Sequence, residues 1–143
     1  MGEPAPRGTE TILLVEPEAE SRTLAAFLLA RLGYAVLEAH NAMEALKIYD
    51  ERGGGVDLLL AEMRMPRVNG PELAQLLAAR DASLCVLFLA DPGYERLARR
   101  IAAQKRLPFL PRPFTRRGLA ERVRQVLDRS GRRPKVLTAG TLR

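Results

Sequence analysis

Five short apolar runs alternate with amphipathic segments along most of this chain, and no other feature limits its fold as strongly. The runs cover residues 11–15, 34–38, 56–61, 84–90 and 108–112. Most of them are continuously apolar, which is typical of parallel strands covered on both faces. The run 34–38 is short and ends in a charge, so it is the candidate edge strand. The alternation predicts a parallel sheet between two helical layers, a three-layer α/β/α sandwich.

The segments between these runs predict five helices. The first covers 19–32 and stops at Gly33, and the second runs from the capping pair Asn41 and Glu44 to about residue 51. Pro71 opens the third, the fourth covers 93–104, and Thr115 caps the fifth. Apolar residues at helical spacing, which we expect to face the sheet, are Leu24, Phe27, Leu28, Leu32, Leu73, Leu76, Leu77, Leu119, Val123, Val126 and Leu127.

The length of 143 residues fits one domain. We expect a flexible N-terminal segment over 1–10, the domain over 11–129 and a basic tail or linker over 130–143. No apolar run approaches the roughly 18 residues of a membrane span, and residues 1–10 do not resemble a signal peptide. The single cysteine, Cys85, excludes a disulfide framework and reads as a small core residue. A cytoplasmic location is the expectation.

The formal charge of +6 is unevenly distributed. Residues 1–90 carry 8 Lys/Arg and 13 Asp/Glu, whereas residues 91–143 carry 15 and 4. A basic C-terminal third suits an acidic protein surface, a nucleic acid or a membrane surface, or is simply a solvated arginine-rich face. Aromatic residues are sparse there, which disfavours stacking on single-stranded nucleic acid.

Charged residues follow the predicted strands, at the edge of the sheet where open α/β folds place their sites. Glu16, Pro17 and Glu18 follow the first strand, Glu62 the third, Ala90 and Asp91 the fourth, and Arg112 the fifth. We therefore expect acidic groups and one guanidinium, from segments far apart in sequence, to converge at this edge.

Four segments, in order and at matching separations, resemble the receiver domain of response regulators in two-component signalling. They are LLVEPE (13–18), GYAVLEAHNAMEAL (33–46), VDLLLAEMRMPRVNGPEL (56–73) and LPRPFT (110–115). The resemblance covers residues 11–128 and implies a flavodoxin-like (βα)5 fold with a five-stranded parallel sheet of order 2-1-3-4-5. It also implies phosphoryl transfer from a histidine kinase to an aspartate after the third strand, assisted by Mg²⁺.

The positions that the resemblance assigns to this chemistry all carry other residues here. Glu62 stands at the phosphoacceptor position, and its extra methylene moves the carboxylate by about 1.5 Å, when errors of about 1 Å cost roughly a hundredfold in rate. Glu16 and Pro17 stand at the acidic pair, so one metal ligand is lost. Ala90 replaces the Ser/Thr hydroxyl and Arg112 the lysine.

These departures lead to a hypothesis of a receiver that signals without phosphorylation. Arg112, together with Arg64, is expected to pair with Glu62 or Glu16 and to replace the metal by fixed positive charge. We expect no cofactor, no metal and no catalysis. Phe109, at the position of the switch aromatic, is expected to be a packed ring. Two alternatives stay open: Glu18 could reach inward in place of Pro17, and Glu62 or a nearby acid could still be phosphorylated with Mg²⁺.

The basic surface around the fourth helix, fifth strand and fifth helix is the expected partner face, because receivers meet partners there. Its arginines are Arg96, Arg99, Arg100, Arg116, Arg117, Arg122 and Arg124. An acidic protein surface, on a histidine kinase or an output protein, is the natural complement. Like charges disfavour a symmetric homodimer through this face, and the oligomeric state stays open. Nucleic-acid binding is a third possibility, and His40, Met63 and Met65 are interpreted as surface or packing residues.

Overall fold

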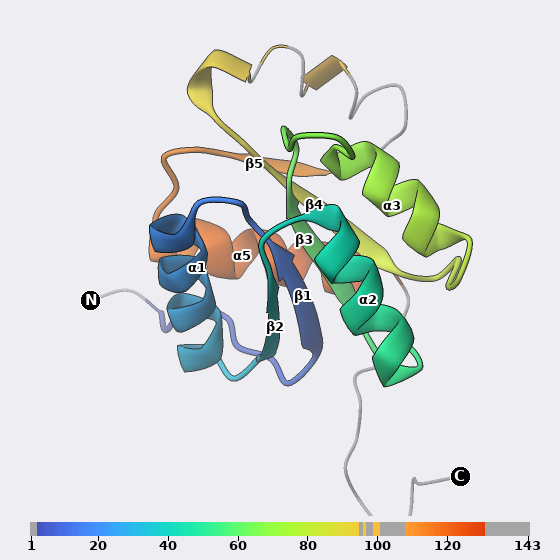
Figure 1. Ribbon diagram of the computed structural model, residues 1–143. Coiled ribbons are helices and arrows are strands. Elements are labelled where there is room, and N and C mark those ends of the chain that lie inside the picture. Colours follow the sequence, from blue (N-terminus) through green and yellow to red (C-terminus); the bar gives the residue numbers. More distant parts are fainter. Residues whose placement is uncertain (1–2, 95, 97–98, 101–107, 131–143) are drawn as a thin grey trace, which may run out of the picture.

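Five parallel strands form one sheet in a computed structural model that describes residues 3–94, 96, 99–100 and 108–130 (Figure 1). The order across the sheet is β2-β1-β3-β4-β5, as predicted. Its strands are β1 (Thr11–Val15), β2 (Ala35–Ala39), β3 (Leu58–Glu62), β4 (Cys85–Ala90) and β5 (Phe109–Pro111). Each strand overlaps one of the five apolar runs, and β2 is an edge strand as expected.

Helices cover both faces of the sheet, which confirms the three-layer sandwich (Figure 1). On one face lie α1 (Ala19–Arg31) and α5 (Arg116–Arg129), and on the other lie α2 (Ala42–Arg52) and α3 (Gly70–Ala78). A short 3-10 helix, η1 (Pro92–Tyr94), follows β4. Most of the predicted fourth helix (93–104) and nearly all of the predicted tail (130–143) lie outside the described residues.

The central strands β1 and β3 are buried at every position because helices cover both faces of the sheet. Ile12 and Leu14 of β1 pack with α1 and α5, whereas Leu13 and Val15 pack with α2 and α3. This follows from the two-residue period of a strand, which sends neighbouring side chains to opposite faces. The helices begin at side-chain caps: Asn69 and the backbone N–H of Glu72 form one half of a reciprocal capping box at α3.

The face that α1 presents to the sheet differs from the prediction. The helix buries Ala25, Ala26 and Leu29, while Leu24 is 58% exposed and Phe27 56% exposed. Apolar residues occur nearly all round this helix, so their periodicity does not select one side, and the small alanines allow a closer approach to the sheet. A smaller correction concerns α3, in which Leu73 and Leu77 are buried as predicted, but Leu76 is exposed. The predicted stripe of α5 is buried throughout.

The segment 3–10, which we expected to lie outside the domain, makes several contacts with it. Gly8 donates its backbone N–H to the carbonyl of Leu32 at 3.0 Å. The carboxylate of Glu10 is buried and pairs with both terminal nitrogens of Arg124, at 3.0 and 2.7 Å. Arg117 donates to the carbonyl of Glu3. Within the part of the chain that the structure describes, no helix has the length and apolar character needed to cross a membrane.

Candidate functional site

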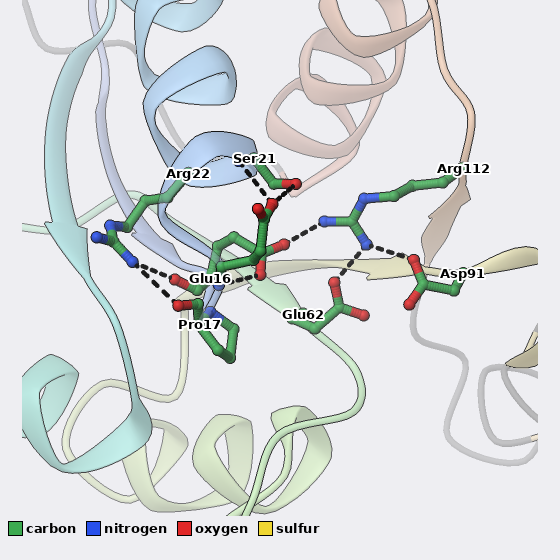
Figure 2. Close-up of polar contacts among 8 residues, drawn as sticks. Glu16, Pro17, Ser21, Arg22, Glu62, Asp91 and Arg112 are labelled. Atoms are coloured by element: carbon green, nitrogen blue, oxygen red, sulfur yellow. Dashed lines mark hydrogen bonds and ion pairs between the residues drawn. The ribbon is translucent and has the colours of Figure 1, made fainter.

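The carboxyl ends of the strands bring the predicted charged residues together. Glu16 follows β1, Glu62 is the last residue of β3, and Arg112 follows β5, so parallel topology alone places all three at one edge. They meet in an open pocket between the loops (Figure 2). The residues that line it are Glu16, Pro17, Glu18, Ser21, Glu62, Arg64, Met65, Pro66, Asp91 and Arg112.

The guanidinium of Arg112 bridges the two buried acids of this pocket (Figure 2). Its Nη1 donates to Oε2 of Glu62, and its Nη2 donates to Oε1 of Glu16. Nη1 also lies 3.2 Å from Oδ1 of the exposed Asp91. The side chain of Arg112 is itself only 19% exposed. The pairing that we hypothesised from the sequence is therefore present, with both acids at once.

Two buried carboxylates share this one buried cation, and the imbalance affects protonation. Burial raises the pKa of Glu62 to about 7, and the like charge of Glu16 acts in the same direction, while Arg112 opposes both. For Arg112, burial acts to lower the pKa, but the charges and hydrogen bond of Glu62 and the charge of Glu16 outweigh it and raise the pKa. The arginine is therefore always charged, and Glu62 carries a proton for part of the time at neutral pH.

The loop after β1 is held by contacts that fix Glu16. Arg22 donates to the carbonyl of Glu16 at 2.7 Å, and the backbone N–H of Glu18 donates to Oε2 of Glu16 at 2.9 Å. Glu18 itself caps α1 by accepting from the N–H of Ser21 at 2.9 Å. The alternative in which Glu18 turns inward is therefore wrong for this structure. Sequence reasoning missed Arg22, because a contact to backbone carbonyls leaves no side-chain pattern.

Three other predicted site residues take no part in these ion pairs, and of them only Arg64 lines the pocket. Arg64 lies over the ring of Tyr94, 5.7 Å from its centre, and among the described residues it forms no ion pair with Glu62 or Glu16. Ala90 is completely buried. Phe109 is half-buried, and the guanidinium of Arg99 lies 5.3 Å from the centre of its ring.

The donor set in this pocket does not fit a magnesium ion. Mg²⁺ needs nearly octahedral oxygen ligands and at least one or two accessible carboxylates. Here Arg112 occupies one oxygen of each buried acid, and Pro17 offers no side-chain ligand where a second acid would be needed. Among the residues that the structure describes, no three His, Cys, Asp or Glu side chains are grouped to hold a metal ion. A bound cation would also meet the repulsion of the guanidinium.

The arginines of the predicted partner face fall into two groups. Arg96, Arg99, Arg100 and Arg116 are exposed. By contrast, Arg117 and Arg124 turn toward the segment 3–10, and half-buried Arg122 has its Nε 3.5 Å from the carbonyl of Phe109. The sequence could not reveal this difference for Arg117 and Arg124, because their partners lie more than a hundred residues away along the chain.

The residues interpreted as surface or packing residues are placed as expected. His40 is exposed, and its Nδ1 lies 2.7 Å from Glu44. Cys85, Met63 and Met65 are buried in the core.

Comparisons with known proteins agree with the fold. The chain is 34% identical over 122 residues to the sensor kinase CckA of Brucella abortus, which covers 85% of this chain and 13% of that protein. It is 35% identical over 121 residues to the transcriptional regulatory protein CpxR of Klebsiella pneumoniae, covering 83% of this chain and 50% of the relative. The chain thus spans half or less of the length of these curated relatives.

Solved structures give the same result. The receiver domain of the hybrid histidine kinase CckA matches with a TM-score of 0.67 and 37% identity, over 82% of this chain and 98% of that domain. A response regulator receiver domain protein from Clostridium thermocellum matches with a TM-score of 0.74 and 25% identity, over 84% and 95%. The family model of the response regulator receiver domain matches residues 12–124. This chain therefore belongs to the response regulator receiver domain family of two-component signalling proteins.

Proposed function

We propose that this receiver domain acts without phosphorylation, as a protein-interaction module whose pocket charge is balanced by Arg112. The observation that carries the proposal is the bridge from Arg112 to Glu62 and Glu16. In phosphoryl transfer, catalysis depends on positioning and on cations that stabilise the charge of the transferred group. The arginine is a fixed cation that is already paired, so it needs neither a metal nor a phosphate to stay in place.

Three properties of the pocket disfavour phosphoryl transfer to Glu62. Arg112 holds an oxygen of the carboxylate that would have to attack. Burial keeps that carboxyl protonated part of the time at neutral pH, and a protonated carboxyl is a poor nucleophile. Pro17 and Ala90 supply neither a metal ligand nor a hydroxyl for the phosphoryl oxygens. Each property acts on a different requirement of the reaction, so their effects combine.

Phosphorylation is tested by incubating the protein with acetyl phosphate and Mg²⁺ and measuring its intact mass. We expect no covalent phosphate on the wild-type chain. A positive control combines Pro17→Asp, Glu62→Asp, Ala90→Thr and Arg112→Lys, which restores the residue types of the family at the four altered positions. This variant should gain the mass of one phosphoryl group. A phosphorylated wild-type protein whose modification disappears in Glu62→Gln would refute the proposal and favour a working phosphoacceptor.

The interaction face that we propose is centred on the exposed arginines before and after β5. Arg99 and Arg122 both contact Phe109, so the basic residues on the two sides of β5 are joined through this ring and its carbonyl. Arg117 and Arg124 contact the segment 3–10, whereas the arginines exposed on either side of β5 are Arg96, Arg99, Arg100 and Arg116. A protein surface rich in aspartate and glutamate complements them.

The face is tested with fluorescent poly-glutamate as the acidic probe. We expect binding that weakens with salt and is lost in the triple variant Arg96→Glu, Arg99→Glu and Arg100→Glu. Arg52→Glu, on α2, which packs beside β2 at the edge of the sheet opposite β5, is the control and should bind normally. Equal losses in the triple variant and the control would refute a localised face. Tighter binding of duplex DNA than of poly-glutamate would favour the nucleic-acid alternative.

A further inference from the structure

Helix α1 leaves an apolar strip on the outside of the molecule that the packing of the domain does not explain. Leu24 is 58% exposed and Phe27 56% exposed, although both are large apolar residues. Single exposed apolar side chains are ordinary on protein surfaces. Here two lie three residues apart and therefore next to each other on one helix face. No other described element covers this face, and α1 lies at the edge of the molecule in Figure 1.

The whole exposed stripe of α1 has the spacing of a helix-packing seam. Its members recur every three or four residues, and they are Glu20, Thr23, Leu24, Phe27, Ala30 and Arg31. A seam of this spacing is what one helix presents to another in a two-helix contact. The small residues Thr23 and Ala30 beside the apolar pair allow a second helix to approach closely.

Charge at the two ends of the seam indicates which helix would fit. Glu20 lies in the first turn and Arg31 in the last. The pair Glu20 and Arg31 and the pair Leu24 and Phe27 share one midpoint along the helix, between Ala25 and Ala26. In an antiparallel two-fold contact, Glu20 would therefore meet Arg31 of a second copy in the same register in which Leu24 meets its Phe27. A parallel copy would instead set like charges opposite each other.

We propose that this receiver domain self-associates through α1, with the helices of two copies packed antiparallel about a two-fold axis. The contact is isologous, so each favourable pair occurs twice. The helix dipole gives Glu20 and Arg31 a role in the monomer, but it gives none to the exposure of Leu24 and Phe27. The arginine-rich face around β5 is disfavoured for a symmetric dimer by its own charge, whereas α1 carries both signs.

The contact is small, so the dimer should be weak. One helix from each copy buries less than the roughly 1,200 Å² that stable interfaces need. We expect a dissociation constant on the order of 0.1 mM, within the range of transient association. Because Phe27 is capped by the guanidinium of Arg31, at 5.6 Å from the ring centre, the arginine has two functions at the seam. It shields the ring in the monomer and faces Glu20 of the other copy in the dimer.

Sedimentation velocity of the full chain, from about 10 µM to about 1 mM, tests this dimer. We expect concentration-dependent association of the wild-type protein. Glu20→Arg and Arg31→Glu each set like charges opposite each other at both ends of the seam. Either change should raise the dissociation constant by at least about tenfold. An equimolar mixture of the two variants restores opposite charges at both ends, so it should associate where neither variant alone does.

Loss of the apolar contact gives an independent measurement. Phe27→Ser and Leu24→Ser should each abolish association, while Met43→Ser, an equally exposed apolar position on α2, should leave it unchanged. Circular dichroism checks that each variant keeps its helices, and restored association of the mixture shows by itself that both charge variants are folded. A wild-type protein that stays monomeric at 1 mM would overturn the proposal. So would a mixture of folded charge variants that fails to associate, which would leave α1 as a site for a different protein.

Discussion

The substitution Glu62→Gln should change how the stability of the domain depends on pH. Glutamine keeps nearly the same shape and can still accept a hydrogen bond from Arg112, but it cannot titrate. In the folded protein, burial raises the pKa of Glu62 from an ordinary 4.5 to about 7. Between these two values the folded chain keeps the proton that the unfolded chain has released, so rising pH favours unfolding. The stabilising contribution of the proton is complete below pH 4.5 and is lost as the pH passes through 7.

The size of this effect follows from the two pKa values. One pH unit between them corresponds to about 1.4 kcal/mol, so a rise from 4.5 to about 7 corresponds to about 3 kcal/mol. The side chain of Glu62 is only 7% exposed, so screening by water reduces this figure little. The free energy of unfolding of the wild-type protein should therefore fall by up to about 3 kcal/mol relative to Glu62→Gln between pH 4.5 and pH 8.

Urea denaturation followed by circular dichroism, at intervals from pH 4.5 to pH 8, measures this difference directly. All other titrating groups are common to the two proteins and cancel in the comparison. Glu10→Gln is the control, because the hydrogen bond from Arg124 lowers the pKa of Glu10, so that its contribution is lost only below pH 4.5 and its curve should run nearly parallel to that of the wild type across this window. Parallel curves for wild type and Glu62→Gln across the window, or a wild-type free energy of unfolding that rises relative to that of Glu62→Gln with increasing pH, would refute the reasoning.

Two further predictions concern the packing around the site. A methyl group added by Gly70→Ala would lie 2.6 Å from the carbonyl oxygen of Glu62, which is backbone and cannot move aside, so the free energy of unfolding should fall by about 2 kcal/mol. Urea denaturation checks this, and Gly93→Ala, which meets nothing within 4 Å, should cost little. Arg124→Met removes the guanidinium that holds Glu10, so amide hydrogens of residues 3–10 should exchange roughly tenfold faster by mass spectrometry. Unchanged exchange would show that other contacts hold this segment.

The site was predictable because its members are fixed by position along the chain. Glu16, Glu62 and Arg112 each stand at the end of an apolar run, and parallel topology brings all such ends to one edge. The sequence did not indicate that Arg112 would form ion pairs with both acids at once. It also suggested Arg64 as a pocket cation, but a nearby aromatic ring, Tyr94, competes for that side chain.

The fold was harder to predict where one sequence pattern was compatible with two packing arrangements. In α1, both Leu24 with Phe27 and Ala25 with Leu29 have helical spacing, and only close packing against the sheet chooses between them. Likewise, the arginines of α5 look alike in the sequence. Arg124 differs from its neighbours because Glu10, at the other end of the chain, lies buried beside it. Long-range pairs of this kind leave no local pattern.

The bridge made by Arg112 has a mechanical consequence for the sheet. Its side chain begins beyond β5, a three-residue strand at the edge, and ends on the last residue of β3 and on residues that follow β1 and β4. Arg112 thus links four strands at the carboxyl-terminal edge of the sheet. Separation of β5 from the sheet must break the ion pairs between Arg112 and the two carboxylates. By the same coupling, a group that displaces the guanidinium weakens the attachment of the edge strand. A protein bound to β5 would therefore be coupled in free energy to the ion pairs of Arg112 without contacting the pocket.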